Sequence, residues 1–283
     1  MSWFALKPQK EDCTYANLPH NRKEAFFDIV HNRYDILLGF ILLYLLSLSP
    51  LAIVFALSLL AEQSLISQGL DNTSLQVQLW WNSFFRDLLY FPASLLFFVV
   101  LAGSLKIYRK LAFQEPILFW GDFGRGIKEN FFFVLGTGAL GWIGFLLAEI
   151  TKNSLFQGSA LWQIILGYIP FSLFILIVLP ALLYALAAQP IYTDSWGKKI
   201  KNGFRFVVAH LWVSLLYGIL FSQVWIILEV GIVWLDLAFF LWFCLLLPFL
   251  QLSFVLTANH FFDEDINFEH FPELYGRGIY PRS

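Results

Sequence analysis

Two ionisable residues lie inside long apolar stretches and are the first candidates for chemistry. At 1.5 Å per residue, His210 lies about 6 Å inside the stretch 206–227, and Asp236 lies about 6 Å inside the stretch 232–257. In a membrane helix such residues mark ion paths, proton relays or ligand contacts. The two positions fall toward opposite faces, and no Lys, Arg, Glu or second Asp lies in the predicted core between them. We therefore expect a structural role for His210 and an outer-interface position for Asp236, without a proton relay.

A second pattern fits the active-site motif of some serine enzymes. Ser195 and Lys198 have the S-x-x-K spacing, in which a lysine activates a serine nucleophile. The companion motifs of those enzymes are absent from the sequence. Asp194 and Ser195 also stand where a helix needs an N-cap. We therefore interpret the motif as a helix cap and predict no catalytic residue, so we do not expect an enzyme.

The acidic residues after the last apolar stretch resemble part of a calcium-binding loop. Asp263, Asp265 and Asn267 match its first ligands, but Phe268 replaces the turn glycine and Leu274 stands at the twelfth position. No paired cysteines, HExxH motif or phosphate-binding glycine loop occurs elsewhere in the sequence. We therefore expect a solvated acidic tail, and neither a metal nor a cofactor. The missing phosphate loop also argues against an ATP-driven engine within this chain.

The composition indicates which class of protein has to position these residues. Hydrophobic residues make up 59% of the 283 residues, aromatic residues 19% and charged residues 13%, and the mean hydropathy is +0.68. Soluble proteins have roughly twice that charged fraction, about 25%. The net charge of -2 gives no reason to expect nucleic acid binding, and two cysteines exclude a disulfide scaffold. The sequence therefore predicts an all-α polytopic membrane protein.

Six apolar stretches are long enough to cross a bilayer. Each Lys, Arg or Asp at the centre of a membrane helix costs about 2.5–3.5 kcal/mol, so the intervals between charges mark the spans. About 20 residues cross the ~30 Å hydrocarbon core, and the second interval only just reaches that length. The fourth stretch contains Pro170 and Pro180, and we interpret it as one kinked helix. The predicted spans are residues 36–60, 88–105, 131–148, 161–188, 206–227 and 232–257.

The distribution of positive charge predicts the orientation of these spans. All 18 Lys and Arg residues except Arg86 and Lys152 fall in segments on one side of the predicted membrane. Connecting segments rich in Lys and Arg stay in the cytoplasm. We therefore expect both termini to be cytoplasmic, with an amphipathic segment 1–35, a membrane domain 36–257 and a C-terminal tail 258–283. The first apolar run starts too late for a cleaved leader peptide.

Three cytoplasmic segments are expected to form amphipathic helices at the membrane surface. Apolar residues recur every three or four positions in 120–134, in 196–207 and, more weakly, in 26–37. Such a helix lies in the interface and then turns into the bilayer. Its cations are expected to contact a protein partner or anionic lipid headgroups, each lipid contact being worth about 1 kcal/mol. The residues of this predicted docking surface are Arg125, Lys128, Lys198, Lys199, Lys201 and Arg205.

Two further features bear on how the helices pack. Residues 124–135 and 197–208 share the pattern G-x-x-I-K-x-x-F-x-F-V, which indicates either a duplicated hairpin or convergent helix-entry chemistry. The third predicted span carries small residues spaced four, three and four apart, which allow close helix contact in lipid. We expect this face to pack within the chain, and a homo-oligomer contact is the alternative. The small residues are Thr137, Gly141, Gly144 and Ala148.

Five short segments form a pattern that extends over most of the chain. They are residues 27–33 (FDIVHNR), 92–96 (PASLL), 105–110 (LKIYRK), 122–131 (DFGRGIKENF) and 271–278 (FPELYGRG). Together they resemble the YesL family of bacterial integral membrane proteins. The sequence departs from the family pattern at one glycine inside the fourth segment, where we expect a bulkier residue, and in a long first external loop.

The resemblance implies a protein of the bacterial plasma membrane that carries a domain without an assigned activity. Relatives tend to be encoded beside carbohydrate uptake genes, which implies subunits of a sugar ABC transporter as partners. We therefore expect a non-enzymatic accessory protein, embedded among membrane lipids, that docks through its basic segments. The alternative is a transporter or binder of a small neutral solute or lipid, which the kinked fourth helix favours. A polar cavity enclosed at the membrane midplane would support that alternative, and a solidly packed bundle would count against it.

Overall fold

The computed structural model describes residues 18–156, 161–228 and 233–280, and every regular element in those residues is a helix. Residues 1–17 of the predicted N-terminal segment lie outside the described part. In chain order the elements are α1 Arg22–Asn32, α2 Tyr34–Ser67, α3 Asn72–Ala93, α4 Leu95–Ala112, α5 Phe119–Phe156, α6 Leu161–Leu173, the π-helical turn η2 Phe174–Val178, α7 Leu179–Ala188, α8 Trp196–Ala209, α9 Leu211–Leu228, α10 Val233–Phe262, the π-helical turn η3 Asp263–Asn267 and α11 Phe268–His270.

Within the described residues, four helices are long and apolar enough to cross a membrane: Tyr34–Ser67, Phe119–Ser154, Leu161–Ala188 and Leu235–His270. Two further helix pairs reach the same length and hydropathy when each pair is counted as one span. These pairs are α3 with α4, which bend by 42°, and α8 with α9, which bend by 111°. The prediction of an all-helical, membrane-embedded chain is therefore confirmed, with four to six candidate spans.

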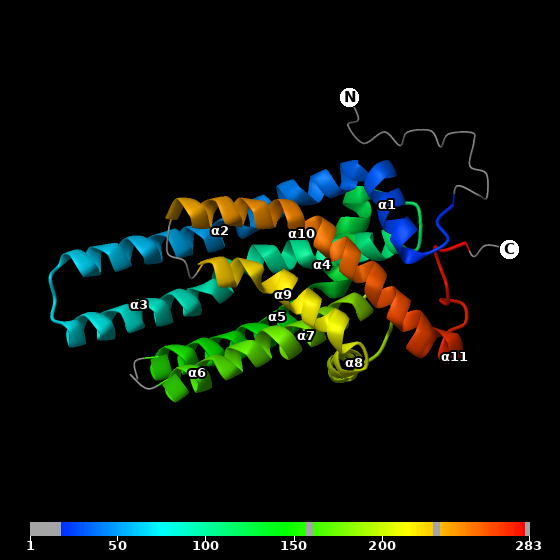
Figure 1. The fold of residues 1–283 in the computed structure, drawn as a ribbon. Coiled ribbons are helices and arrows are strands. Elements are labelled where there is room, and N and C mark those ends of the chain that lie inside the picture. Colours follow the sequence, from blue (N-terminus) through cyan, green and yellow to red (C-terminus); the bar gives the residue numbers. More distant parts are fainter. Residues whose placement is uncertain (1–17, 157–160, 229–232, 281–283) are drawn as a thin grey trace, which may run out of the picture.

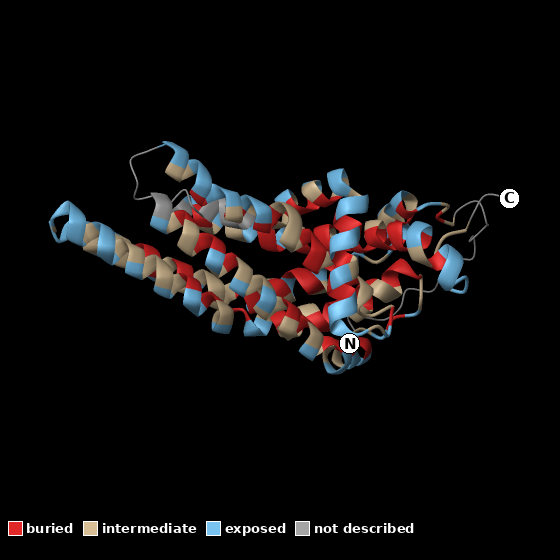
Figure 2. Ribbon diagram, turned by 90° about the horizontal axis from the view of Figure 1, so that it is seen from below, coloured by how far each residue is buried: buried red, intermediate tan, exposed pale blue. Residues whose placement is uncertain are grey.

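Most of the long helices run lengthwise and spread apart toward one end of the molecule, whereas α8 runs across them (Figure 1). At that end, which we call the tip, α2 is followed by α3 and α5 faces α6. At the opposite end, the base, lie α1, α8 and α11. The two ends of the described chain meet at the base, where the N–H of Tyr280 donates to the carbonyl of Pro19 at 2.9 Å. Figure 2 shows that the tip of α2 and α3 is mostly exposed, whereas buried residues gather toward the base.

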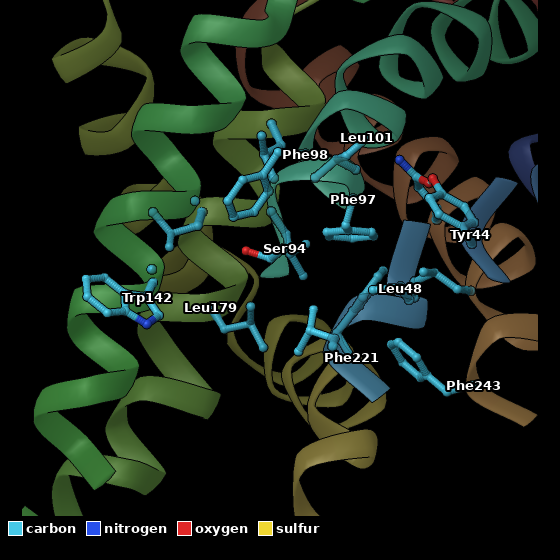
Figure 3. Close-up of a pocket in the computed structure, with 18 of the residues that line it drawn as sticks. Tyr44, Leu48, Ser94, Phe97, Phe98, Leu101, Trp142, Leu179, Phe221 and Phe243 are labelled. Carbon is cyan, nitrogen blue, oxygen red and sulfur yellow. The ribbon is translucent and has the colours of Figure 1, made fainter. Parts of the chain in front are cut away.

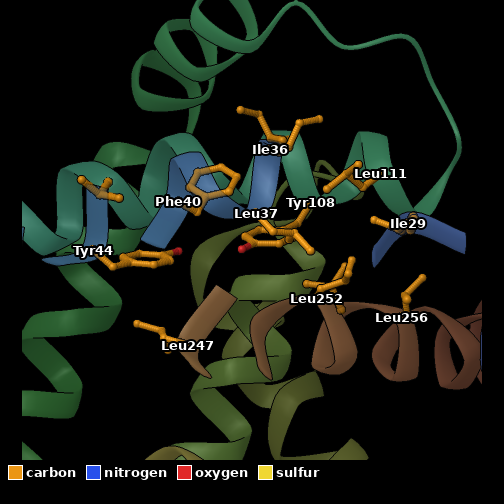
Figure 4. Close-up of a cluster of buried hydrophobic side chains, with 14 of the residues drawn as sticks. Ile29, Ile36, Leu37, Phe40, Tyr44, Tyr108, Leu111, Leu247, Leu252 and Leu256 are labelled. Carbon is orange, nitrogen blue, oxygen red and sulfur yellow. The ribbon is translucent and has the colours of Figure 1, made fainter. Parts of the chain in front are cut away.

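The largest buried cluster joins α1, α2, α4 and α10 (Figure 4). Phe40 of α2 stacks on Tyr108 of α4, with 5.1 Å between the ring centroids. Leu252 of α10 and Ile29 of α1 belong to the same cluster, and all four side chains are buried. Because lipid is as apolar as these side chains, close packing rather than exclusion of water stabilises helix contacts inside a membrane.

The structure corrects the prediction of a surface helix over residues 120–134. Those residues are the first part of the single helix α5, which runs from Phe119 to Phe156 without a turn into a separate span. The reason lies in the contact with α4. A methyl group on Gly126 would lie 2.7 Å from the carbonyl oxygen of Gly103, so the two backbones touch there. One turn later, Asn130 Nδ2 donates to the carbonyl of Ala102 at 3.2 Å. The unexpected glycine at 126 is therefore required by packing.

The segment 196–207 behaves differently, because α8 ends in a sharp break. The chain turns by 111° between α8 and α9, at His210. The Nε2 atom of His210 lies 2.8 Å from Asp265 Oδ2, and the ring stacks on Phe261 with 3.6 Å between centroids. The predicted structural role of His210 is thus confirmed, and its partners come from the far end of the chain.

The fourth predicted span is a helix that contains a π-helical turn. Pro180 has no N–H, so the carbonyl of Leu176 loses its α-helical donor, and the chain forms η2 over Phe174–Val178. The backbone of α9 approaches this turn closely, since a methyl group on Gly218 would clash with the carbonyl oxygen of Ile175. The predicted irregularity is therefore a change of helix type beside a tight helix contact.

The small face of α5 packs within the chain. Thr137 and Ala148 are buried. A methyl group on Gly141 would lie 3.1 Å from Leu182, and one on Gly144 would lie 3.2 Å from Phe174. The expected packing against the chain's own helices is therefore present, and η2 and α7 already cover this face.

The tail beyond residue 258 is not a solvated segment. Helix α10 continues to Phe262, and Asp263 is buried against Arg22 of α1, with 2.7 Å between Oδ2 and Nη2. Asn267 is also buried and accepts a hydrogen bond of 2.7 Å from the hydroxyl of Tyr192. The prediction of a solvated acidic tail is wrong for these two residues, because each has a partner on an element distant in the sequence.

Candidate functional site

A partly open cavity of about 300 Å³ lies between the helices of the bundle (Figure 3). Residues of α2, α3, α4, α5, η2, α7, α9 and α10 line it, and nearly all of their side chains are aliphatic or aromatic. Ligand-binding pockets in proteins have volumes of about 300–1,000 Å³ and mostly apolar linings. Labelled lining residues in Figure 3 are Tyr44, Leu48, Ser94, Phe97, Phe98, Leu101, Trp142, Leu179, Phe221 and Phe243.

The cavity lies where the surrounding helices are irregular. Helix α3 gives way to α4 at Ser94, a lining residue whose Oγ donates to the carbonyl of Phe91 at 2.8 Å. The π-helical turn η2 contributes Phe174 to the lining. Pro50 of α2 and Pro248 of α10 stand beside further lining positions. Proline and π turns bend helices and separate them locally, which explains why the packing opens here.

One wall of the cavity contains a polar group in which every member has a partner. The hydroxyl of Tyr44 donates to Gln251 Oε1 and lies 3.1 Å from Ser104 Oγ. Gln251 Nε2 donates to Ser104 Oγ at 3.0 Å, and Ser104 Oγ donates to the carbonyl of Leu101 at 2.9 Å. Because these groups satisfy one another, they join α2, α4 and α10 and leave few hydrogen bonds for a polar ligand.

Asp236 lines the same cavity, although we expected it at the outer interface. Only 1% of its surface is exposed, and neither carboxylate oxygen has a hydrogen-bond partner among the described residues. Helix α10 packs against α2, so the fourth helical position that we placed near water is covered by neighbouring helices. The chain itself therefore covers Asp236, and both of its carboxylate oxygens lack a hydrogen-bond partner among the described residues.

The structure also reveals a cluster of charges toward the tip, which we name the tip charge cluster. It consists of Glu62, Arg86, Asp87, Glu149 and Lys152. Arg86 Nε lies 2.9 Å from Asp87 Oδ1, its Nη1 lies 3.9 Å from Glu62 Oε1, and Lys152 Nζ lies 2.9 Å from Glu149 Oε2. Asp87, Glu149 and Lys152 are buried, which contradicts the expectation of a core without buried Lys, Arg or Glu.

The tip charge cluster borders the cavity. Trp142 lines the cavity, and its Nε1 donates to the carbonyl of Asp87 at 2.9 Å. Tyr90 also lines the cavity, and the guanidinium of Arg86 lies 5.9 Å from the centre of its ring. The sequence did contain a signal for this cluster, since its members are the charges that end the predicted spans on the outer side. We took them as boundaries, whereas the structure pairs them with one another.

Most side chains of the two partial motifs have partners elsewhere in the described residues. Lys198 pairs with Asp194 at 2.6 Å, while Ser195 occupies the N-cap position of α8 without a capping side-chain bond. In the tail, Asp263 pairs with Arg22, Asp265 with His210, and Asn267 with Tyr192. Asn267 Nδ2 also donates to Asp263 Oδ1 at 2.8 Å, so these residues hold the C-terminal segment to α1, to α8 and to one another.

The predicted docking surface loses one of its six cations. Lys199 is buried, its Nζ donates to Gln189 Oε1 at 2.5 Å, and it lies 5.2 Å from the centre of the Phe133 ring. It faces inward because the apolar stripe of α8 is the side that packs on the bundle. The cations that remain exposed are Arg125, Lys128, Lys198, Lys201 and Arg205.

Comparison of the chain with protein-family models, with curated proteins and with solved structures finds no match.

Proposed function

We propose that this chain is an integral membrane protein that binds an apolar or amphipathic molecule, such as a membrane lipid, inside its helix bundle. The observation that carries the proposal is the cavity of about 300 Å³ and its apolar lining. Alkyl chains and aromatic rings fit walls made of leucine and phenylalanine. A sugar needs many hydrogen bonds, and a cavity that offers few of them rejects it.

The irregular helices around the cavity support a binding role. Membrane helices that are interrupted near the middle line the substrate sites of many transporters. Here the bend at Ser94 and the π turn Phe174–Val178 both border the cavity. Two irregular helices that border one cavity are the arrangement found at such substrate sites, and this favours a binding site.

The proposal includes an orientation with six spans in a bacterial plasma membrane. Each bent pair then counts as one span, and the base faces the cytoplasm. What supports it is the charge distribution, since Arg86 and Lys152 belong to the tip charge cluster while the other described Lys and Arg residues lie outside it. Accessibility of single cysteines introduced at Ser67 and at Lys201 to a membrane-impermeant reagent tests this orientation.

The binding function is tested by measuring what the purified protein retains. The protein is extracted from its native membrane in a mild detergent, and the bound small molecules are identified by native mass spectrometry. In the variant Ala52→Phe a ring occupies space on the cavity wall, and we expect it to lose most of the bound material. Ala56→Phe, one turn away on α2 and outside the lining, is the matched control and retains it.

Two outcomes would contradict the binding function. One is a wild-type protein that carries no apolar molecule under conditions in which it stays folded and monodisperse. The other is equal retention by Ala52→Phe and Ala56→Phe, which would place the bound molecules on the outer surface of the helices rather than in the cavity.

A second function that we propose is that of an accessory subunit of a membrane transporter, as the resemblance to the YesL family implies. The supporting observation is that Arg125, Lys128, Lys201 and Arg205 stay exposed. Anionic lipid headgroups are the competing occupant of these cations. Replacing all four with glutamine should abolish co-purification of transporter subunits from the native host. Unchanged co-purification by a variant that still inserts would refute docking through these residues.

A further inference from the structure

Asp236 is a buried acid without a hydrogen-bond or ion-pair partner among the described residues. Its exposed fraction is 1%, and both carboxylate oxygens lack a donor among the described residues. A carboxylate removed from water without a hydrogen-bond partner or a counter-ion is strongly destabilised. Such a group is stabilised either by taking up a proton or by pairing with a cation that comes from outside the chain.

The cavity offers no cation of its own to this acid. Among the described residues that line it, Asp236 is the one with an ionisable Asp, Glu, Lys, Arg or His side chain. The nearby cations of the tip charge cluster have carboxylates beside them, Arg86 with Asp87 and Lys152 with Glu149. Asp236 is thus an acidic residue of the cavity lining that has no cation beside it among the described lining residues.

We propose that Asp236 binds the protonated amine of an amphipathic molecule whose alkyl part occupies the cavity. This inference rests on the binding function proposed above and adds the chemical class of the head. An ammonium group supplies a positive charge and three N–H donors, which match the two free carboxylate oxygens. The apolar walls accept the alkyl part, and the low polarity around Asp236 strengthens the ion pair.

The test compares three probes that share one alkyl chain and differ in the head. Dodecylamine carries an ammonium group, dodecanol a neutral hydroxyl and dodecanoate a negative charge. The full-length protein in lipid nanodiscs is incubated with each probe, and the bound fraction is measured by native mass spectrometry. For the wild type we expect dodecylamine to bind about tenfold or more tightly than dodecanol, and dodecanoate to bind least, since charge-assisted hydrogen bonds exceed neutral ones.

Variants at position 236 then assign the preference to this side chain. Asp236→Asn should lower the affinity for dodecylamine to that for dodecanol, and leave dodecanol unchanged. Asp236→Glu keeps the carboxylate and should keep the preference, which separates recognition from a general loss of folding. Asp71→Asn, which removes an exposed carboxylate at the beginning of α3, controls for unspecific attraction of the amine and should have no effect.

The outcomes separate this inference from the binding function on which it rests. If all three probes bind the wild type equally, or if Asp236→Asn retains the preference for the amine, the assignment of Asp236 is refuted while the cavity remains a binding site. If none of the probes binds the wild type more than the cavity-filled Ala52→Phe, the binding function itself fails.

Discussion

The guanidinium of Arg22 and the carboxylate of Asp263 form a buried ion pair of 2.7 Å across 241 residues of sequence. The second terminal nitrogen of Arg22 donates to the carbonyls of Ala112 and Arg277 at 3.2 and 3.0 Å. One side chain therefore joins α1 to the end of α4, to η3 and to the C-terminal segment. Arg22 therefore holds these segments together at the base of the molecule.

Replacement of Arg22 by alanine should destabilise the protein strongly. Removal of one partner leaves Asp263 as an uncompensated buried charge, and such changes cost about 3–5 kcal/mol. The expected result is a clear fall in the thermal midpoint of the detergent-solubilised protein, followed by the loss of the monodisperse peak in size-exclusion chromatography. Lys23→Ala, the exposed neighbour on α1, is the control, and equal midpoints for the two variants would contradict the assignment.

Gly126→Ala should weaken the contact between α4 and α5. The added methyl group would lie 2.7 Å from the carbonyl oxygen of Gly103, so the helices must separate, and overpacking of this kind costs about 1–3 kcal/mol. Gly124→Ala is the matched control, because a methyl group there meets nothing within 4 Å and alanine favours the helix. The same thermal assay should show a lower midpoint for the first variant and an unchanged or higher one for the second.

Asp71 should give the start of α3 a dependence on pH. The Ser74 hydroxyl and backbone N–H bind this carboxylate and hold its pKa below the usual range. Because the folded-state pKa is the lower one, the cap is fully present at neutral pH and is lost as the pH falls through that pKa. Hydrogen exchange in the first turn of α3 should therefore accelerate in acid. Asp71→Asn keeps an acceptor and should remove the pH dependence, whereas an unchanged profile would argue against this cap.

Lys199 and Lys201 should differ in what they contribute. Lys199→Met removes the buried hydrogen bond to Gln189, so we expect a loss of about 1–3 kcal/mol of stability. Lys201→Met changes an exposed side chain, and such changes stay within about 0.5 kcal/mol. Lys201→Met should reduce binding to vesicles that contain anionic lipid. Lys199→Met should leave that binding unchanged when the two variants are compared at equal folded fraction. The reverse pattern would contradict the burial of Lys199.

Charge spacing was sufficient to locate the apolar helices, because a charge in hydrocarbon is costly wherever it occurs. The predicted spans 36–60, 131–148 and 161–188 fall inside single helices, and 88–105 and 206–227 fall across the two bent pairs. Charge spacing did not predict where the helices end. Hydropathy records where a helix is apolar, and α2 continues to Ser67 well beyond the point where it ceases to be so.

The continuity of α5 could not be predicted from its own residues. An amphipathic stripe with interspersed charges is typical of a surface helix, and residues 120–134 have that pattern. What keeps the helix in the bundle is the contact of Gly126 with Gly103, which depends on where α4 lies. From one sequence alone, a glycine does not indicate which helix packs against it.

The candidate site shows the same limit. The spacing of Asp236 indicates that it lies near the beginning of α10, but its burial depends on how the neighbouring helices pack over it. The pairing of Glu149 with Lys152, three residues apart, was within reach of sequence reasoning. The partnership of Arg86 with Glu62 requires the hairpin of α2 and α3, and the cavity requires residues of eight separate elements to meet around it.

The π-helical turn Phe174–Val178 sets a limit on how this gene can change. A π turn holds one residue more than the α-helical turn it replaces, so the loss of a single codon here would restore an ordinary helix. Every side chain that follows would then rotate by about 100° around the helix axis. Leu182 and Leu186 would leave the cavity wall, and neighbouring residues of α7 would take their places. Substitutions in α7 can therefore accumulate one at a time, whereas an in-frame deletion at the turn exchanges the whole wall at once.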